Sequence, residues 1–409
     1  MIAPLPPVVP PVTVAAKGRR IRLLLGLHLL VALLSILLGF LPFPAPDARW
    51  QIRTARFQLE AASHIPPDEV ALPHNWLTRG PDGTAGFYRI PVDPAALTRN
   101  GENLAIFIPR FTARVDVLVN SRRIASSGGT PSIETVARNT SLLAPVPAGL
   151  WRPYDNLVEI RIETRGILSG FLDRPSIGPE SALRPAFAAR TTLFIMLPAL
   201  LAIFSLVLAG LLLVHWLRRE EAGGYAVLAL ALMLGSLHAL NLVPASPLYS
   251  ESLHRALHAM PVLEAPLTAI AVTLMLGHRL GHPVVYLVPG VGLFLLGLFG
   301  NFQLFTIGMV TIGLPIIGFF LGLIVWLGAS ISIREGHRAG LVLSLAGSAT
   351  LLLWLHDLFV VTNIIAESRI VLARLFYPLV TSVLGAAVVI RLAFFPGAAS
   401  RPRPKKTDR

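Results

Sequence analysis

Six polar residues interrupt the long apolar segments in the second half of this 409-residue chain. An ionisable side chain inside a membrane span costs roughly 2.5–3.5 kcal/mol near the centre, so each one requires a partner or a water-filled cavity. With the segment directions derived below and a rise of about 1.5 Å per helical residue, all six are expected within about 10 Å of the outer surface. We call them the polar outer layer: His238, Asn241, Glu264, His356, Asp357 and Arg374.

Two interpretations of the polar outer layer stay open. In the first, its side chains face a shared polar cavity that opens toward an external domain and binds a ligand or couples a signal. Asp357 and Arg374 are then the preferred ion pair, because they lie at matching depths on consecutive segments. Glu264 is the alternative partner of Arg374, or it pairs with a histidine of the layer. In the second interpretation, the groups only hold the helices in register, since polar contacts between spans contribute about 0.6 kcal/mol on average.

Other chemistry that these residue types could perform is not supported by their spacing. Histidine and carboxylate are zinc ligands, but the adjacent His356 and Asp357 point about 100° apart on a helix, so we predict no metal site. The chain has no cysteine, which excludes thiolate chemistry and disulfides. Motifs typical of metalloproteases and serine hydrolases are absent as well. We therefore expect no enzyme, no metal and no cofactor.

Apolar segments must position the polar outer layer. The chain is 54% hydrophobic and only 14% charged, whereas a soluble domain carries roughly 25% charge. A helix needs on the order of 20 apolar residues to cross a membrane. Eight windows meet this requirement, and the last seven are predicted to form a bundle over 191–396. The windows are 21–43, 191–217, 224–245, 259–280, 283–300, 303–329, 338–363 and 370–395.

Basic residues predict the orientation of these spans. Lys17, Arg19, Arg20 and Arg22 precede the first span, and a basic tail, 397–409, follows the last. Positive residues that flank spans are retained in the cytoplasm, so both ends are predicted to be cytoplasmic. The formal net charge of +13 then reflects topology and contact with anionic lipids, not nucleic-acid binding. Residues 45–190 and the loops near 246–258 and 364–369 fall outside.

The first hydrophobic segment has two interpretations. It follows a basic stretch, 1–20, and its apolar run, 21–43, is longer than the 7–15 residues usual in a signal peptide. This length favours an uncleaved signal anchor. The sequence Phe43-Pro44-Ala45-Pro46 is compatible with a cleavage site, in which case the segment is a signal peptide and seven spans remain.

Residues 50–185 show the pattern of an antiparallel β-sandwich. Val115, Val117 and Val119 alternate with polar residues, so they predict one buried face of a strand that ends in a turn at Asn120-Ser121. Residues 104–108 and 157–162 predict further strands. Without cysteine, this domain depends on its own hydrophobic core.

Two motifs in this domain resemble the jelly-roll, galactose-binding-like modules of family-2 glycosidases. The motifs are Leu72-Pro73-His74-Asn75-Trp76 and Gly86-Phe87-Tyr88-Arg89, and Ser121 stands where those modules usually have glycine. The resemblance implies a ligand site, for a carbohydrate or another polar metabolite. An alternative places the two large aromatic side chains in the core. The candidate ligand-binding residues are His74, Asn75, Trp76, Tyr88 and Arg89.

The order of an external jelly roll and seven spans resembles the bacterial seven-transmembrane receptors with diverse intracellular signalling modules. The most specific element is Trp354-Leu355-His356-Asp357. The resemblance implies a sensory receptor of the bacterial inner membrane, with its large domain in the periplasm and its C-terminus in the cytoplasm. This chain departs from the family after Phe395-Pro396-Gly397, where no output module follows, so we expect the signal to pass to a separate protein.

The expected fold is therefore an all-α seven-helix membrane bundle with an all-β jelly-roll domain and an N-terminal anchor helix. Expected partners are membrane lipids, a small-molecule ligand, a cytoplasmic signalling protein in trans and a second copy of the chain in a homodimer. The alternative function is a non-signalling adaptor or accessory subunit of an envelope-polysaccharide or transport system.

Overall fold

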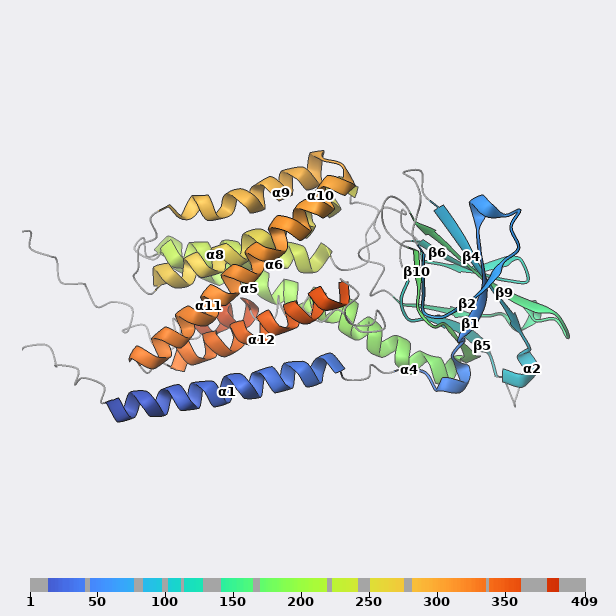
Figure 1. The fold of residues 1–409 in the computed structure, drawn as a ribbon, viewed down its shortest axis with the longest axis horizontal. Coiled ribbons are helices and arrows are strands. Elements are labelled where there is room, and N and C mark those ends of the chain that lie inside the picture. Colours follow the sequence, from blue (N-terminus) through green and yellow to red (C-terminus); the bar gives the residue numbers. More distant parts are fainter. Residues whose placement is uncertain are drawn as a thin grey trace, which may run out of the picture.

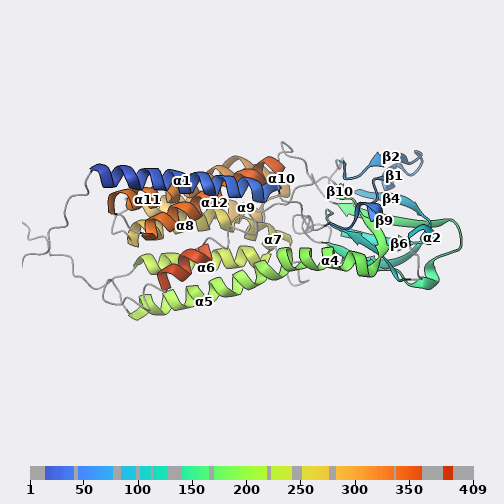
Figure 2. The same ribbon diagram turned by 90° about the horizontal axis from the view of Figure 1, so that it is seen from below.

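The fold is described from a computed structural model. It describes residues 14–40, 45–76, 84–97, 102–111, 114–127, 141–164, 170–218, 223–241, 251–275, 282–335, 338–361 and 381–389. A β domain lies at one end of an elongated bundle of helices (Figure 1), and α1 runs along the bundle (Figure 2).

The β domain consists of antiparallel sheets. The largest has the strand order β2-β1-β4-β9-β6-β7, a second has the order β11-β5-β8, and β10 pairs with β3. The strands are β1 (Thr54–Leu59), β2 (Asp68–Ala71), β3 (His74–Trp76), β4 (Thr84–Val92), β5 (Leu104–Ile108), β6 (Arg114–Val119), β7 (Arg122–Ser126), β8 (Leu142–Pro145), β9 (Asn156–Thr164), β10 (Gly170–Leu172) and β11 (Ser176–Pro179).

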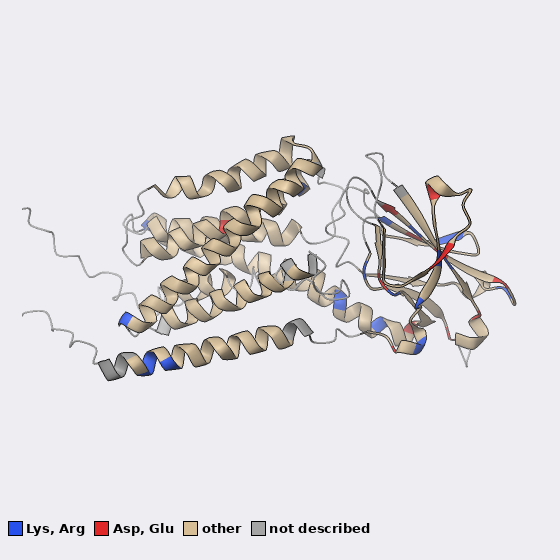
Figure 3. Ribbon diagram, viewed as in Figure 1, with Lys and Arg blue, Asp and Glu red and all other residues tan. Residues whose placement is uncertain are grey.

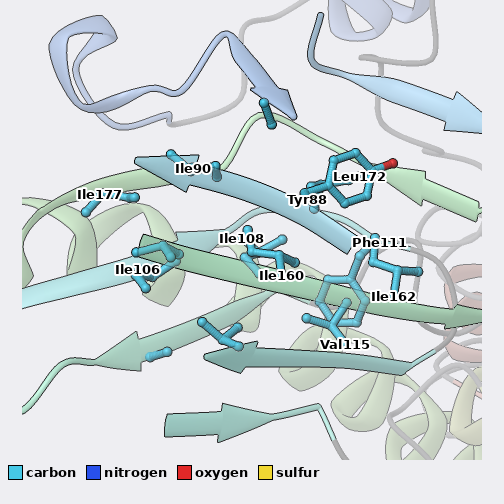
Figure 4. Close-up of a cluster of buried hydrophobic side chains, with 14 of the residues drawn as sticks. Tyr88, Ile90, Ile106, Ile108, Phe111, Val115, Ile160, Ile162, Leu172 and Ile177 are labelled. Atoms are coloured by element: carbon cyan, nitrogen blue, oxygen red, sulfur yellow. The ribbon is translucent and has the colours of Figure 1, made fainter. Parts of the chain in front are cut away.

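One hydrophobic core holds these sheets together (Figure 4). Successive side chains of a strand point to opposite faces, so Val115, Val117 and Val119 enter the core from β6, while Asp116 lies on the opposite face and is also buried. The strands predicted at 104–108, 114–120 and 157–162 are all present. Jelly-roll connectivity stays a prediction.

The turn at Asn120-Ser121 is also present, and both residues have positive φ, 50° and 69°. Such a conformation suits a tight hairpin and favours glycine. Ser121 therefore occupies a strained position that would suit glycine better.

The helical part consists of one helix before the β domain and a series of helices after it. Its helices are α1 (Val14–Phe40), α4 (Glu180–Thr191), α5 (Leu197–Arg218), α6 (Gly223–Asn241), α7 (Glu251–His258), α8 (Met260–Met275), α9 (Val288–Phe299), α10 (Phe302–Gly308), α11 (Leu314–Glu335) and α12 (Arg338–Val361). Two π-helical turns, η4 (Thr192–Met196) and η6 (Met309–Gly313), join α4 to α5 and α10 to α11. The short α2 (Pro94–Leu97) lies in the β domain, and residues 381–389 are helical.

The chain is a multi-pass membrane protein. Among the described residues, five helices are long and apolar enough to cross a membrane: Gly18–Leu37, Glu180–Arg218, Gly223–Asn241, Ser252–Met275 and Gln303–Arg334. Two shorter apolar helices, Pro283–Phe299 and Gly340–His356, accompany them. Charged residues gather on the β domain and along α4 and are sparse in the bundle (Figure 3). The bundle of seven spans stays a prediction.

Two boundaries differ from the sequence-based prediction. The predicted loop near 246–258 contains the helix α7, because Leu253, Ala256 and Leu257 recur at helical spacing among charged residues that interrupt the apolar window. The helix leading into the first bundle span begins at Glu180, before the predicted start at 191, and its early turns pack on the β domain.

Candidate functional site

Three histidines meet at the end of the bundle next to the β domain. We call His238 of α6 and His254 and His258 of α7 the histidine cluster. The Nε2 atoms of His254 and His258 lie 3.2 Å apart, and their ring centroids are separated by 4.7 Å. The ring of His238 lies 5.9 Å from that of His258. His238 and His254 are buried, while His258 is half-buried.

Backbone carbonyls fix part of this cluster. Nδ1 of His238 lies 3.4 Å from the carbonyl oxygen of Leu257. Asn241, three residues further along α6, donates from Nδ2 to the carbonyl oxygen of His254 over 3.1 Å. Thus two members of the polar outer layer, His238 and Asn241, tie α6 to α7.

Glu264 of α8 lies deeper than the histidine cluster and is 0% exposed. Its carboxyl group packs against Gly235, where an added Cβ would lie 2.4 Å from Oε1. Thr381 approaches the carboxyl from the last described helix, but neither carboxyl oxygen has a partner in strict hydrogen-bond geometry among the described residues. Gly235 precedes His238 by three residues, so Glu264 lies about one helical turn below the histidine cluster.

The remaining members of the polar outer layer contribute less to the site that can be described. His356 is half-buried on α12. The predicted ion pair of Asp357 and Arg374 lies outside the described residues: Arg374 lies beyond α12, and the side chain of Asp357 is not described. Glu264 forms no ion pair with any described residue.

A small cavity lies near Glu264. It lies between α8, α11, α12 and the last described helix, and its volume of about 20 Å³ is room for about one water molecule. Thr268, Thr350 and Thr381 contribute to its walls. The hydroxyls of Thr268 and Thr350 donate to backbone carbonyls of their own helices, so a sugar neither fits there nor finds free hydroxyl donors from these two residues.

In the β domain, the two large aromatic candidates lie in the core. Tyr88 is 0% exposed and Trp76 is buried, and both rings pack against Phe57. The Tyr88 hydroxyl lies 3.0 Å from Nδ1 of His74. Burial raises the pKa of Tyr88 and lowers the pKa of His74. As placed, the rings of Trp76 and Tyr88 offer no exposed face on which a sugar could stack.

The other two candidates face outward. Asn75 is exposed at the centre of β3. Arg89 donates from Nε to Glu159 over 3.0 Å and from Nη1 to Gln58 over 2.7 Å. A role for these polar groups in ligand binding stays a prediction.

The outer face of the largest sheet carries a network of alternating charges. Arg161 lies at its centre, with ion pairs to Glu60 and Glu163 of 3.1 and 3.2 Å. Partial burial opposes its charge, but the two carboxylates outweigh this effect and raise the pKa of Arg161. Cation–π contacts extend this network, because the guanidinium groups of Arg89 and Arg161 both lie over the ring of Phe87.

His254 and His258 were not among the predicted site residues, because they fall in the predicted loop near 246–258. Their spacing of four residues was a visible signal, because residues at i and i+4 share one face of a helix. The buried ion pair of Arg110 and Asp173, at 2.8 Å, carried no local signal because its members lie far apart in the sequence.

In comparisons with known proteins, no family model matches this chain and no curated protein is significantly similar to it.

Proposed function

We propose that this protein is a sensory receptor of the bacterial inner membrane. In this proposal the β domain and the neighbouring end of the bundle bind a small polar ligand, such as a carbohydrate. The bundle then shifts between two states that a separate cytoplasmic protein reads. A ligand can produce such a shift only if it binds one state more tightly than the other.

The observation that carries the proposal is the continuity between the β domain and the first bundle span. Leu183 and Ala186 of α4 are buried against Ala105 and Phe107 of β5. Every residue of β5 is buried, because the sandwich core covers one face and α4 covers the other. The same helix continues through η4 into α5. A rigid-body movement of the β domain would therefore be passed directly to α5.

The ion pair beneath this junction supports the same argument. Arg110 and Asp173 follow β5 and β10 and are buried or nearly so, and Arg190 of α4 lies close enough to both to interact electrostatically. Breaking a buried pair by removing one member costs about 3–5 kcal/mol. The contact between α4 and the β domain thus has both apolar and charged components.

An insertion series tests this coupling. The full-length chain, in lipid nanodiscs, carries a single cysteine in place of Gly223, an exposed residue at the start of α6, labelled with an environment-sensitive dye. A panel of monosaccharides and amino acids is screened by thermal unfolding. We expect at least one compound to raise the unfolding temperature and to change the dye fluorescence.

Alanine insertions after Thr191 then separate binding from transmission. Two residues turn the following helix by about 200° relative to the β domain, whereas four residues nearly restore its orientation. We expect the dye response to disappear in the variant with two inserted alanines and to return in the variant with four. The compound should raise the unfolding temperature of both variants. A compound that binds without any dye response in the parent chain would instead support the adaptor function, and a panel without any binder would count against the receptor.

A further inference from the structure

The helix α7 carries a pair of histidines whose spacing and geometry match a metal site. We propose that His254 and His258, together with His238, bind a divalent transition-metal ion of the zinc class at the end of the bundle next to the β domain. This site does not depend on the proposed receptor function, and its test needs no signalling readout.

The distance between the two ring nitrogens is the first argument. Zinc binds imidazole nitrogen at about 2.0–2.1 Å, so two nitrogens that share one ion and lie 3.2 Å apart subtend an angle of about 100° at it, near the tetrahedral angle. The spacing of four residues on one helix produces this approach without a long-range contact. The pair is therefore preformed for a common ion.

The protonation of His238 is the second argument. A carbonyl oxygen can only accept a hydrogen bond, so Nδ1 of His238 carries a proton in its contact with Leu257, and Nε2 is the ring atom through which His238 would bind a metal ion. Histidine ligands of metal ions commonly donate their other ring nitrogen to a backbone carbonyl in this way. Nδ1 of His238 thus has the hydrogen-bond partner that a histidine ligand bound through Nε2 requires.

The neighbouring polar groups also favour a cation. Oδ1 of Asn241 is buried and has no hydrogen-bond partner among the described residues, while its Nδ2 is held by the His254 carbonyl. Arg255, on the same helix as the histidine pair, donates to the carbonyls of Gly297 and Gly300 at the end of α9. The cluster therefore combines imidazole nitrogens with an unsatisfied oxygen acceptor.

The site is incomplete as it stands. In the part of the chain that the structure describes, no three histidine or carboxylate side chains already converge as a full metal centre. The pair supplies two ligands. An approach of His238 toward His258, whose ring centroids are now 5.9 Å apart, supplies the third while Nδ1 keeps its contact with Leu257. Water completes the coordination, which leaves an open position of the kind that catalytic and exchangeable zinc sites keep.

Metal titration tests the site directly. The full-length chain is purified through a tag without histidine, placed in nanodiscs and titrated with ZnCl₂ in competition with a chromophoric chelator. We expect one saturable site per chain. His254→Gln and His258→Gln should each weaken binding by at least about tenfold. The matched control is His64→Gln, which changes an exposed histidine of the β domain and should leave the affinity unchanged.

A second measurement uses the unmodified protein and needs no variant to fold. Because the chain has no cysteine, a visible tetrahedral Co²⁺ spectrum cannot arise from thiolate ligands. Zn²⁺ should displace the Co²⁺ and abolish the spectrum. The proposal is overturned if the parent chain shows neither saturable Zn²⁺ binding nor this spectrum. It is also overturned if a folded double variant, His254→Gln with His258→Gln, binds Zn²⁺ as tightly as the parent. Either result would leave His254 and His258 as a pair that only shares a proton.

Discussion

Individual side chains in the β domain show how one motif can serve the core instead of a surface. His74 and Trp76 belong to the same short strand, yet Trp76 enters the core and His74 contacts the hidden hydroxyl of Tyr88. Gly170 makes room for Trp76, since a Cβ there would lie 2.1 Å from the indole. Packing thus accounts for the positions of His74 and Trp76.

The stability of the β domain should fall in mild acid because of His74. Burial lowers the pKa of His74 in the folded protein below 6.5, so the unfolded chain binds more protons between the two pKa values. The contribution of His74 to the free energy of unfolding is complete above pH 6.5, and it is lost as the pH falls from 6.5 through the pKa of His74 in the folded protein. Denaturant unfolding followed by tryptophan fluorescence, at about pH 7.5 and pH 5, measures the loss.

The variant His74→Gln keeps a polar group and removes the titration, so its stability should depend less on pH over this range. The exposed His64→Gln is the control and should retain the parent's dependence. An unchanged dependence in His74→Gln would assign the effect to another group.

Helices in the bundle approach one another through small residues. Gly328 of α11 and Gly340 of α12 face each other so closely that a Cβ on Gly328 would lie 2.6 Å from the backbone nitrogen of Ser344. Small residues at helix contacts are typical of membrane proteins, because they let backbones pack closely where no hydrophobic effect drives association.

Gly328→Ala should therefore destabilise the contact between α11 and α12 by about 1–3 kcal/mol, since the added methyl must push the backbones apart. Gly322→Ala on the same helix is the matched control, because no atom lies within 4 Å of its added Cβ. Thermal unfolding in nanodiscs compares the two. Equal unfolding temperatures of Gly328→Ala and Gly322→Ala would contradict this prediction, because α11 and α12 would then accommodate the added methyl group without a loss of stability.

The regular elements could be predicted from the sequence, because alternation and long apolar runs are local signals. β6, its turn at Asn120-Ser121 and the apolar helices are examples. The short helix α7 was hidden because charged residues interrupt it. The neighbours of Glu264 could not be predicted at all, since they come from α6 and from the last described helix, and helix packing leaves no local trace.

Across the whole molecule, α1 is a structural part of the bundle. Nε2 of His28 lies 2.8 Å from the hydroxyl of Ser344 on α12, and that hydroxyl also donates to the carbonyl of Val325 on α11. A polar contact of this kind favours a retained anchor, because a cleaved signal peptide would leave Ser344 without it.

Cysteine cross-linking tests whether α1 is retained beside α12. The chain has no cysteine of its own. In a variant with both His28→Cys and Ser344→Cys, a short bifunctional thiol reagent should cross-link the two introduced cysteines in membranes. Leu29→Cys with Ser344→Cys is the control, because Leu29 is 71% exposed and faces away. Cleavage at a protease site inserted at Ser63-His64 should leave the fragments linked only in the first pair. A mature chain that begins after residue 43 would contradict the retained anchor.

The contact between Gly235 and Glu264 has a practical consequence for observing the protein at work. Because the carboxyl group rests directly on the backbone of α6, any sliding or rotation of that helix changes its surroundings. Carboxyl vibrations respond strongly to such changes and can be assigned by replacing Glu264 with Gln. Infrared difference spectroscopy could therefore follow the movement of α6 without any label.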